Sequence, residues 1–156
     1  MSEVIDTQKG KYLTFEIDGD AYGLEIQHVD DIIGIQEITE VPRQPEYVQG
    51  VINLRGKIVP TMDVRIRFGK DYRDYDDRTC IVVLDMKGTS VGIVVDRVLE
   101  VTQISEDTIS EPPGFENESD KKFIAGIGKY ENEPVILLDC NRLLSQSESD
   151  AFSTTE

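Results

Sequence analysis

The sequence contains an internal repeat, and this repeat limits the possible folds more than any other feature. Moving the chain by 69 positions brings Gly88 onto Gly19, and moving it by 76 positions brings Asp139 onto Asp63. Turn residues and apolar positions coincide along both alignments, as expected for two copies of one structural unit. The second copy is therefore expected to form the same elements as the first.

The first copy begins with a pattern of short β-strands. Apolar and polar residues alternate over 11–17, a turn follows at 18–20, and 21–24 is apolar again, which predicts a β-hairpin. Residues 25–28 fit one helical turn. From residue 29 to residue 35 β-branched side chains dominate, and this favours a strand over a continued helix.

A second hairpin is predicted in the stretch from residue 50 to residue 68. Two apolar strands, 51–54 and 57–61, are separated only by Arg55 and Gly56, so the turn between them must be tight. Such a turn needs a positive φ angle, which Gly56 adopts without strain. Arg55 is then exposed at the tip or shoulder of the hairpin.

A proline and an aspartate mark the end of this hairpin. Pro60 cannot donate a backbone hydrogen bond, so its strand is expected at a sheet edge, or is expected to leave the sheet there. Asp63 is a preferred residue before a helix, which predicts a short helix over 63–68 that Gly69 ends. The repeat predicts the equivalent helix over 139–144.

Together these elements predict an all-β fold of two similar small barrels in tandem, each with a short helix. The first barrel is expected over residues 11–77 and the second over 78–145, with a loose segment at 1–10 and a polar tail at 146–156. Units of this size barely hold a core of their own. We therefore expect the barrels to pack together with a groove between them. In such an arrangement the first strand can be shared with the second barrel.

The charge of the chain argues against nucleic acid as a partner. The formal net charge is −15, whereas a nucleic-acid module needs a cationic face that releases counterions. The basic stretch at 50–70 fits either an acidic partner or pairing with its own neighbours. The two copies differ most at the hairpin tip, where Arg-Gly-Lys at 55–57 becomes Glu-Asn-Glu at 131–133. A difference at an exposed turn affects function more than folding.

The cysteines and the apolar runs predict the cellular setting. Cys80 and Cys140 have no spacing typical of metal ligands or of a disulfide framework, and the N-terminus has no apolar signal region. The apolar runs are much shorter than the ~18 residues needed to cross a bilayer. We therefore expect a cytoplasmic protein with reduced thiols and no direct membrane insertion.

The sequence offers few groups for catalysis. His28 is the single histidine of the chain, and we interpret it as an exposed or half-buried residue of a helical turn, because no nucleophile motif accompanies it. Zinc-ligand clusters and phosphate-binding glycine loops are missing too, so no catalytic residue, metal or cofactor is predicted. An enzyme that uses acidic residues such as Asp30 and Asp31 stays open as an alternative. The favoured hypothesis is function through surfaces.

Several of these motifs resemble those of one protein family. The run YVQGVINLRGKIVPTMDVRIRFG has ITEVP and VDDII before it, and VGIVVDRVLEV and GIG…ILLD after it. This order of motifs is similar to that of the CheW family of bacterial chemotaxis adaptors. The resemblance extends over residues 11–145 and implies two five-stranded SH3-like β-barrels packed with pseudo-twofold symmetry.

The resemblance also implies a function. CheW proteins are non-enzymatic scaffolds that couple the cytoplasmic tips of methyl-accepting chemotaxis proteins to the regulatory domain of the histidine kinase CheA. They are associated with membrane receptor arrays through these partners. The same unit also occurs as the coupling half of CheV-type proteins and as the kinase regulatory domain, and a fragment of such a longer chain stays open as the alternative.

Part of the candidate site follows from the glycines and the apolar residues of the matched motifs. Gly50, Asn53 and Gly56 resemble the hairpin determinants of the family. Cys80 and Ile81 match an apolar pair that the family uses at the receptor groove, although both positions fit the core of a strand equally well. A groove lined by the apolar side chains of Val29, Ile32, Cys80 and Ile81 is suited to the amphipathic helical hairpin of a receptor tip.

The charged part of the candidate site is carried by Arg55, which takes the position that supports receptor and kinase coupling in the family. Val29, Asp31 and Ile32 match a V-x-E-I segment on the receptor-facing side, with Asp31 where glutamate is usual. Because aspartate is one methylene shorter, a direct contact between Asp31 and Arg55 is expected to need closer backbones or a bridging water.

Overall fold

The structure is a computed structural model, and it describes residues 10–42, 44–45, 47–86, 88–111 and 123–143. The loose segment expected at 1–10, apart from Gly10, and the polar tail expected at 146–156 lie outside the described residues. All statements below concern the described part of the chain.

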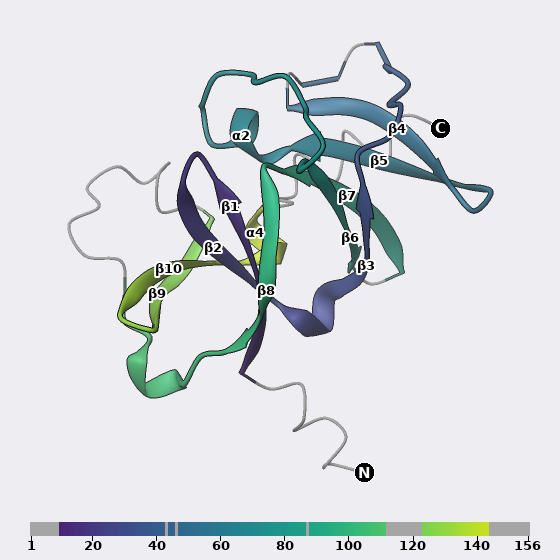
Figure 1. Ribbon diagram of the computed structural model, residues 1–156. Helices are drawn as coiled ribbons and strands as arrows, with labels where there is room; N and C mark the ends of the chain where they lie inside the picture. The colour runs from purple at the N-terminus through teal and green to yellow at the C-terminus, as the bar shows by residue number, and fades with distance from the viewer. Residues whose placement is uncertain (1–9, 43, 46, 87, 112–122, 144–156) are drawn as a thin grey trace.

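The described strands form two five-stranded sheets (Figure 1). Sheet I has the order β8 (Arg97–Gln103), β1 (Lys11–Ile17), β2 (Asp20–Glu25), β10 (Glu133–Leu138) and β9 (Ile124–Tyr130). Sheet II has the order β3 (Val29–Gly34), β6 (Cys80–Met86), β7 (Thr89–Val95), β5 (Lys57–Asp63) and β4 (Val48–Leu54). The short helical segments are η1 (Ile26–His28), α2 (Val64–Arg67), η2 (Glu106–Thr108) and α4 (Cys140–Leu143).

The repeat predicted from the sequence is confirmed strand by strand. β6 begins 69 residues after β1, and β9 and α4 begin 76 residues after β4 and α2. The parallel pairing obeys the same shifts, because Thr61 lies opposite Gly92 in sheet II while Leu137 lies opposite Gly23 in sheet I. The predicted all-β fold of two SH3-like five-stranded units is thus confirmed, although the edge strands of each sheet do not pair with one another to close a barrel.

The two sheets do not follow the expected division into residues 11–77 and 78–145. The hairpin β6–β7 of the second half lies between β3 and β5 of the first, and the hairpin β1–β2 of the first half lies between β8 and β10 of the second. A complete hairpin is exchanged in each direction, where the sequence suggested a single shared strand. The chain passes from sheet I to sheet II through the three-residue helix η1, between β2 and β3, and it returns to sheet I at Asp96, between β7 and β8.

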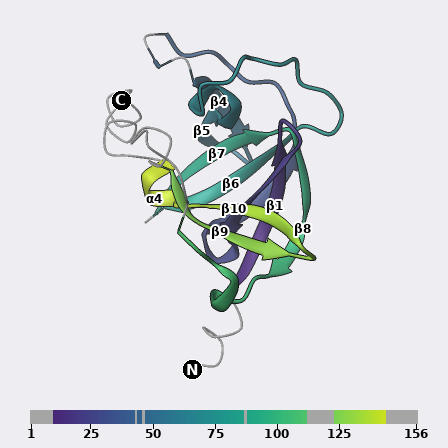
Figure 2. The same cartoon turned by 90° about the vertical axis from the view of Figure 1, so that its left-hand side faces the viewer.

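The exchange gives the two sheets a common core. The largest buried cluster contains side chains of both sheets, among them Phe15 and Leu24 of sheet I and Val82 and Ile93 of sheet II, all of them without exposed surface. Each sheet also has a smaller cluster of its own. Figure 2 shows the two sheets packed against each other, with the β9–β10 hairpin and α4 on the side that faces the viewer. Because the largest core belongs to both sheets, neither is expected to fold without the other.

Both predicted short helices are present, each after an aspartate. The carboxylate of Asp63 accepts a hydrogen bond from the backbone N–H of Arg65 at 2.9 Å, and that of Asp139 accepts one from the backbone N–H of Arg142 at 3.2 Å. The predicted end of the second helix at residue 144 lies outside the described residues. No helix of the described residues is long and apolar enough to span a membrane.

The expectation for Pro60 is only partly met. β5 lies inside sheet II, between β7 and β4. Its pairing with β7 starts at Thr61, however, so the half of β5 that precedes Pro60 pairs with β4 alone. The missing N–H of the proline is therefore tolerated, since it lies just before the ladder with β7 begins.

Candidate functional site

The hairpin tip between β4 and β5 is a tight two-residue turn, as predicted. Arg55 and Gly56 have φ angles of 53° and 83°, which is the pattern of a type I′ turn. A positive φ is unfavourable for arginine. The side-chain oxygen of Asn53 stabilises the turn, because it accepts a hydrogen bond from the N–H of Gly56 at 2.9 Å.

Gly50 allows a close approach of two backbone segments beside the same hairpin. It has a φ of 145°, and a Cβ atom at this position would overlap the carbonyl oxygen of Thr39. Thr39 and Val51 exchange two backbone hydrogen bonds of 2.9 Å. The segment that follows β3 is thereby held along the free edge of β4. Asn53 thus stabilises the turn of the hairpin, and Gly50 allows the neighbouring segment to pack against it.

The exposed guanidinium of Arg55 pairs directly with Asp31 of β3. The distance from Nη2 to Oδ2 is 2.8 Å, and the two side chains are 74% and 24% exposed. The contact needs no bridging water. The other carboxylate oxygen of Asp31 accepts a hydrogen bond from the N–H of Ile32 at 2.8 Å, at a β-bulge in β3. Exposed pairs of this kind contribute about 0.5 kcal/mol to stability, so the pair mainly orients Arg55.

The predicted apolar groove residues lie on two different faces of sheet II. Val29 lies opposite Leu84 and Gly34 lies opposite Cys80. Because directly opposed residues share a face and neighbours alternate, Val29, Ile32 and Cys80 are on one face. Asp31 and Ile81 are on the other.

Ile81 does not line a groove, since its side chain is completely buried in the core of sheet II, where it packs with Ile52 and Val83. The interpretation of this position as strand core is the one that fits the structure. Cys80 and Val29 are half-buried against the common core, whereas Ile32 is 40% exposed. Of the four predicted apolar residues, Ile32 therefore offers the most surface to a partner.

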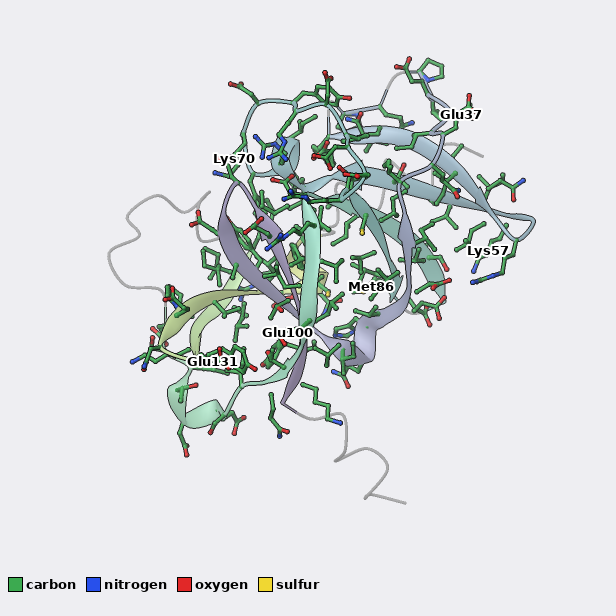
Figure 3. The ribbon with its side chains drawn as sticks, in the orientation of Figure 1. Glu37, Lys57, Lys70, Met86, Glu100 and Glu131 are labelled. Atoms are coloured by element: carbon green, nitrogen blue, oxygen red, sulfur yellow. The ribbon has the colours of Figure 1, made fainter. Side chains whose placement is uncertain are left out.

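The second hairpin tip has the same backbone and the opposite charge. Glu131 and Asn132 have φ angles of 52° and 66°, so this turn is also of type I′. The repeat places Glu131 near the position of Arg55, and Glu100 at the position of Asp31. Both carboxylates raise the pKa of Tyr130, Glu100 more strongly. Figure 3 shows Glu131 at one end of the molecule and Lys57, beside the first tip, at the other.

The sequence did not reveal a charged cluster between the two sheets, built around the buried Arg65 of α2. Its Nη1 atom lies 3.2 Å from Asp18 of the β1–β2 turn and 3.0 Å from Asp96, which follows β7. The hydrogen bond from Arg65 lowers the pKa of Asp18. No local pattern announces such a cluster, because its members are 31 and 47 residues apart from Arg65 in the chain.

The fold and the site define a class of protein: a rigid pair of SH3-like sheets that presents an oriented arginine at one hairpin tip. Among the described residues, no group of three or more His, Cys, Asp or Glu side chains is placed to hold a metal ion. The exposed groups are those of a docking surface.

Comparisons with known proteins identify the family. The CheW-like domain matches residues 11–148. Chemotaxis protein CheW of Klebsiella aerogenes is 34% identical over 143 residues, which cover 92% of this chain and 86% of that protein. Chemotaxis protein CheW of Thermotoga maritima is 34% identical over 136 residues, covering 86% of this chain and 87% of that protein.

A solved structure is similar over nearly the same range. The crystal structure of the scaffolding protein TtCheW from Thermoanaerobacter tengcongensis superimposes with a TM-score of 0.81 at 33% identity, and the match covers 89% of this chain and 94% of that chain. The chain therefore belongs to the CheW-like family, and its role is that of a chemotaxis coupling and scaffold protein.

Proposed function

We propose that this protein couples the cytoplasmic tips of methyl-accepting chemotaxis proteins to the regulatory domain of the histidine kinase CheA, without catalysing a reaction itself. The observation that carries the proposal is the first hairpin tip, where an ion pair with Asp31 of β3 orients the exposed Arg55, while Ile32 is exposed on the other face of the same strand. An exposed apolar side chain and an oriented charge on one edge of the sheet suit a protein partner, because the apolar contact supplies affinity and the charge supplies register.

The common core supports a scaffold that works by fixed spacing. Strands of both halves are interleaved in each sheet, and the largest cluster of buried side chains joins the sheets. A partner bound at the tip of sheet II and a partner bound elsewhere on the molecule would therefore keep a constant relative position. In an array of many receptors, weak individual contacts are sufficient, because tethering raises the effective concentration. The protein would thus be cytoplasmic and reach the membrane array through its partners.

The test is co-sedimentation of the protein with receptor signalling fragments and CheA, with ternary assembly and ATP consumption measured in the same sample. We expect assembly and stimulated ATP consumption with the unaltered protein. Ile32→Ser is expected to weaken assembly at least fivefold, since it removes an apolar contact.

The repeat supplies a matched control. Val101 takes the position of Ile32 in the second copy and is 51% exposed. Val101→Ser should leave assembly within twofold of the unaltered protein. The proposal is contradicted if the unaltered protein neither assembles with these partners nor changes ATP consumption. Equal effects of the two substitutions would contradict the assignment of the docking surface to sheet II.

A further inference from the structure

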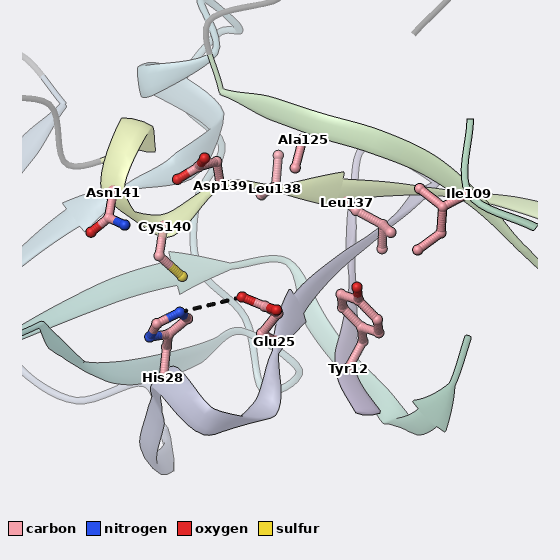
Figure 4. A pocket seen from close by; sticks show the side chains of 10 residues that line it. All are labelled: Tyr12, Glu25, His28, Ile109, Ala125, Leu137, Leu138, Asp139, Cys140 and Asn141. Carbon is pink, nitrogen blue, oxygen red and sulfur yellow. Dashed lines mark ion pairs between the residues drawn. The ribbon is translucent and has the colours of Figure 1, made fainter. Parts of the chain in front are cut away.

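A pocket of about 220 Å³ lies where β2, η1, β10 and α4 meet. The residues that matter here are Tyr12, Glu25, His28, Ile109, Asp139 and Cys140. We call it the junction pocket. Figure 4 shows the thiol of Cys140 directed toward Glu25 and His28, with Tyr12 and Ile109 on the opposite side. The pocket is far larger than the ~30 Å³ share of one water molecule.

The first copy of the repeat fills the corresponding place with one of its own side chains. Tyr75 packs against the core of sheet II, which includes Ile81 and Val94. Its hydroxyl donates a hydrogen bond of 2.7 Å to Oδ2 of Asp63. A tyrosine thus occupies this site in the first copy, with apolar walls and one carboxylate.

The second copy keeps the site but changes its chemistry. The repeat relates Ile81 to Tyr12, Val94 to Glu25 and Asp63 to Asp139. Two walls that are aliphatic in the first copy therefore become a phenol and a second carboxylate. No described residue takes the place of Tyr75 there, and the junction pocket is open.

The strands also separate at this point. In sheet II the parallel pairing continues to Asp63 opposite Val94, whereas in sheet I it ends at Leu137 opposite Gly23. The next positions of sheet I would bring Glu25 opposite Asp139. Like charges directly opposed across strands are destabilising, so an open pocket at this point is more favourable than a continued ladder.

The two carboxylates of the junction pocket raise the pKa values of neighbouring side chains. Burial first, and then Glu25 and Asp139, raise the pKa of Cys140 to about 12. Burial and Glu25 also raise the pKa of Tyr12. Glu25 has His28 at 3.4 Å, and Asp139 has the 61% exposed guanidinium of Arg142 at 3.7 Å in addition to its backbone hydrogen bond at the start of α4. These exposed contacts leave both carboxylates available for a stronger partner.

We propose that the junction pocket binds an arginine side chain of a partner protein. A cavity of about 150 Å³ is large enough for a benzene ring, so the pocket has room for a guanidinium and its stem. The planar guanidinium matches two carboxylates and stacks on the Tyr12 ring, while Ile109 contacts the apolar stem. This inference does not depend on the proposed partners in chemotaxis, because it uses only the asymmetry between the two copies.

The test is a titration of the ¹⁵N-labelled protein with N-acetyl-arginine N-methylamide, followed by backbone amide chemical shifts. The matched probe is the citrulline analogue, which has the same shape without the charge. The arginine probe should give saturable shifts at Glu25, Asp139 and Cys140, and the citrulline probe should bind at least tenfold more weakly. The first-copy residues Asp63 and Val94 should not shift.

Two variants keep the proposal falsifiable. Glu25→Gln keeps the shape of the side chain, and Glu25→Val installs the residue that the first copy has; each should weaken the arginine probe at least fivefold with an unchanged spectrum elsewhere. The proposal is overturned if arginine and citrulline probes bind equally, or if the variants bind as the unaltered protein does. Tighter binding of N-acetyl-tyrosine N-methylamide would also overturn it, in favour of a tyrosine.

Discussion

The two hairpin tips have the same backbone conformation but carry side chains of opposite charge. At the first tip Arg55 pairs with Asp31 at 2.8 Å, whereas at the second tip Glu131 and the counterpart of Asp31, Glu100, are both acidic. Four positive φ angles, two in each turn, show that the fold of the tip was kept. The comparison teaches that the repeat preserves the backbone of the tip while its charge changes, and the proposed partner recognition uses this difference in charge.

The junctions beside the two short helices differ in the same way. In the first copy the buried Arg65 joins Asp18 and Asp96 across the two sheets. The repeat places Asn141 at the position of Arg65, and Asn141 lines the junction pocket. Beside its short helix, the first copy therefore has a charged cluster, whereas the second copy has an open pocket.

The largest expected effect comes from the glycines that follow the start of β4 and β9. Gly50→Ala should destabilise the protein by about 4 kcal/mol, because the new Cβ atom meets the carbonyl oxygen of Thr39 and φ is 145°. Gly126→Ala should cost about 2 kcal/mol, because its Cβ meets Cγ2 of Ile109 at 2.8 Å and the carbonyl oxygen of Ser110 at 3.1 Å, with no positive φ to add strain. Urea unfolding measures the free energy of unfolding of both variants. Equal losses would contradict the expected difference between the two glycine positions.

A smaller effect is expected at the charged junction. Arg65→Ala should destabilise the protein by about 3 kcal/mol, because it leaves Asp96, whose side chain is only 11% exposed, without its nearest cation. Asn141→Ala, the matched change in the second copy, should stay within about 0.5 kcal/mol. Urea unfolding at low and high salt measures both. A cost below about 1 kcal/mol for Arg65→Ala would show that the cluster does not join the sheets.

Removal of one hydroxyl tests the site that Tyr75 fills. Tyr75→Phe should cost about 1.5 kcal/mol at pH 7, since the buried Asp63 loses a hydrogen bond to its charged form. Burial already raises the pKa of Asp63, and the substitution raises it further. A raised carboxyl pKa gives stability at acid pH that is lost as the pH rises through the folded value. The variant should therefore lose more stability at pH 7 than at pH 4, and a pH-independent loss would contradict this.

The sequence predicted the strands and both hairpin turns because their causes are local. The alternation of apolar residues, the glycine of the turn and the aspartate before each helix all act within a few residues. The exchange of hairpins between the sheets could not be predicted, because a hairpin with the same pattern pairs equally well with either copy. The exchange is accompanied by contacts between residues distant in the chain, such as those of the common core, for which no local pattern exists.

Those features of the candidate site that depend on local sequence were also predictable. Arg55 at an exposed tip followed from the turn, whereas the direct ion pair with Asp31 depends on the distance between β3 and the hairpin tip, which the sequence left open. The burial of Ile81 could not be predicted from the sequence. A strand that is buried on both faces and a strand that lines an apolar groove have the same continuous pattern of apolar residues. The cluster of Arg65 needed three segments distant in the chain, for which a single sequence has no signal.

The central claim is that coupling depends on Arg55 and not on the general hairpin architecture. The most direct measurement compares Arg55→Ala with Glu131→Ala for receptor-stimulated ATP consumption by CheA. Each change alters an exposed tip, and each should leave the free energy of unfolding within about 0.5 kcal/mol. We predict that Arg55→Ala loses at least tenfold of the stimulation while Glu131→Ala retains it. Full stimulation by a folded Arg55→Ala variant, or an equal loss in both, would contradict the account.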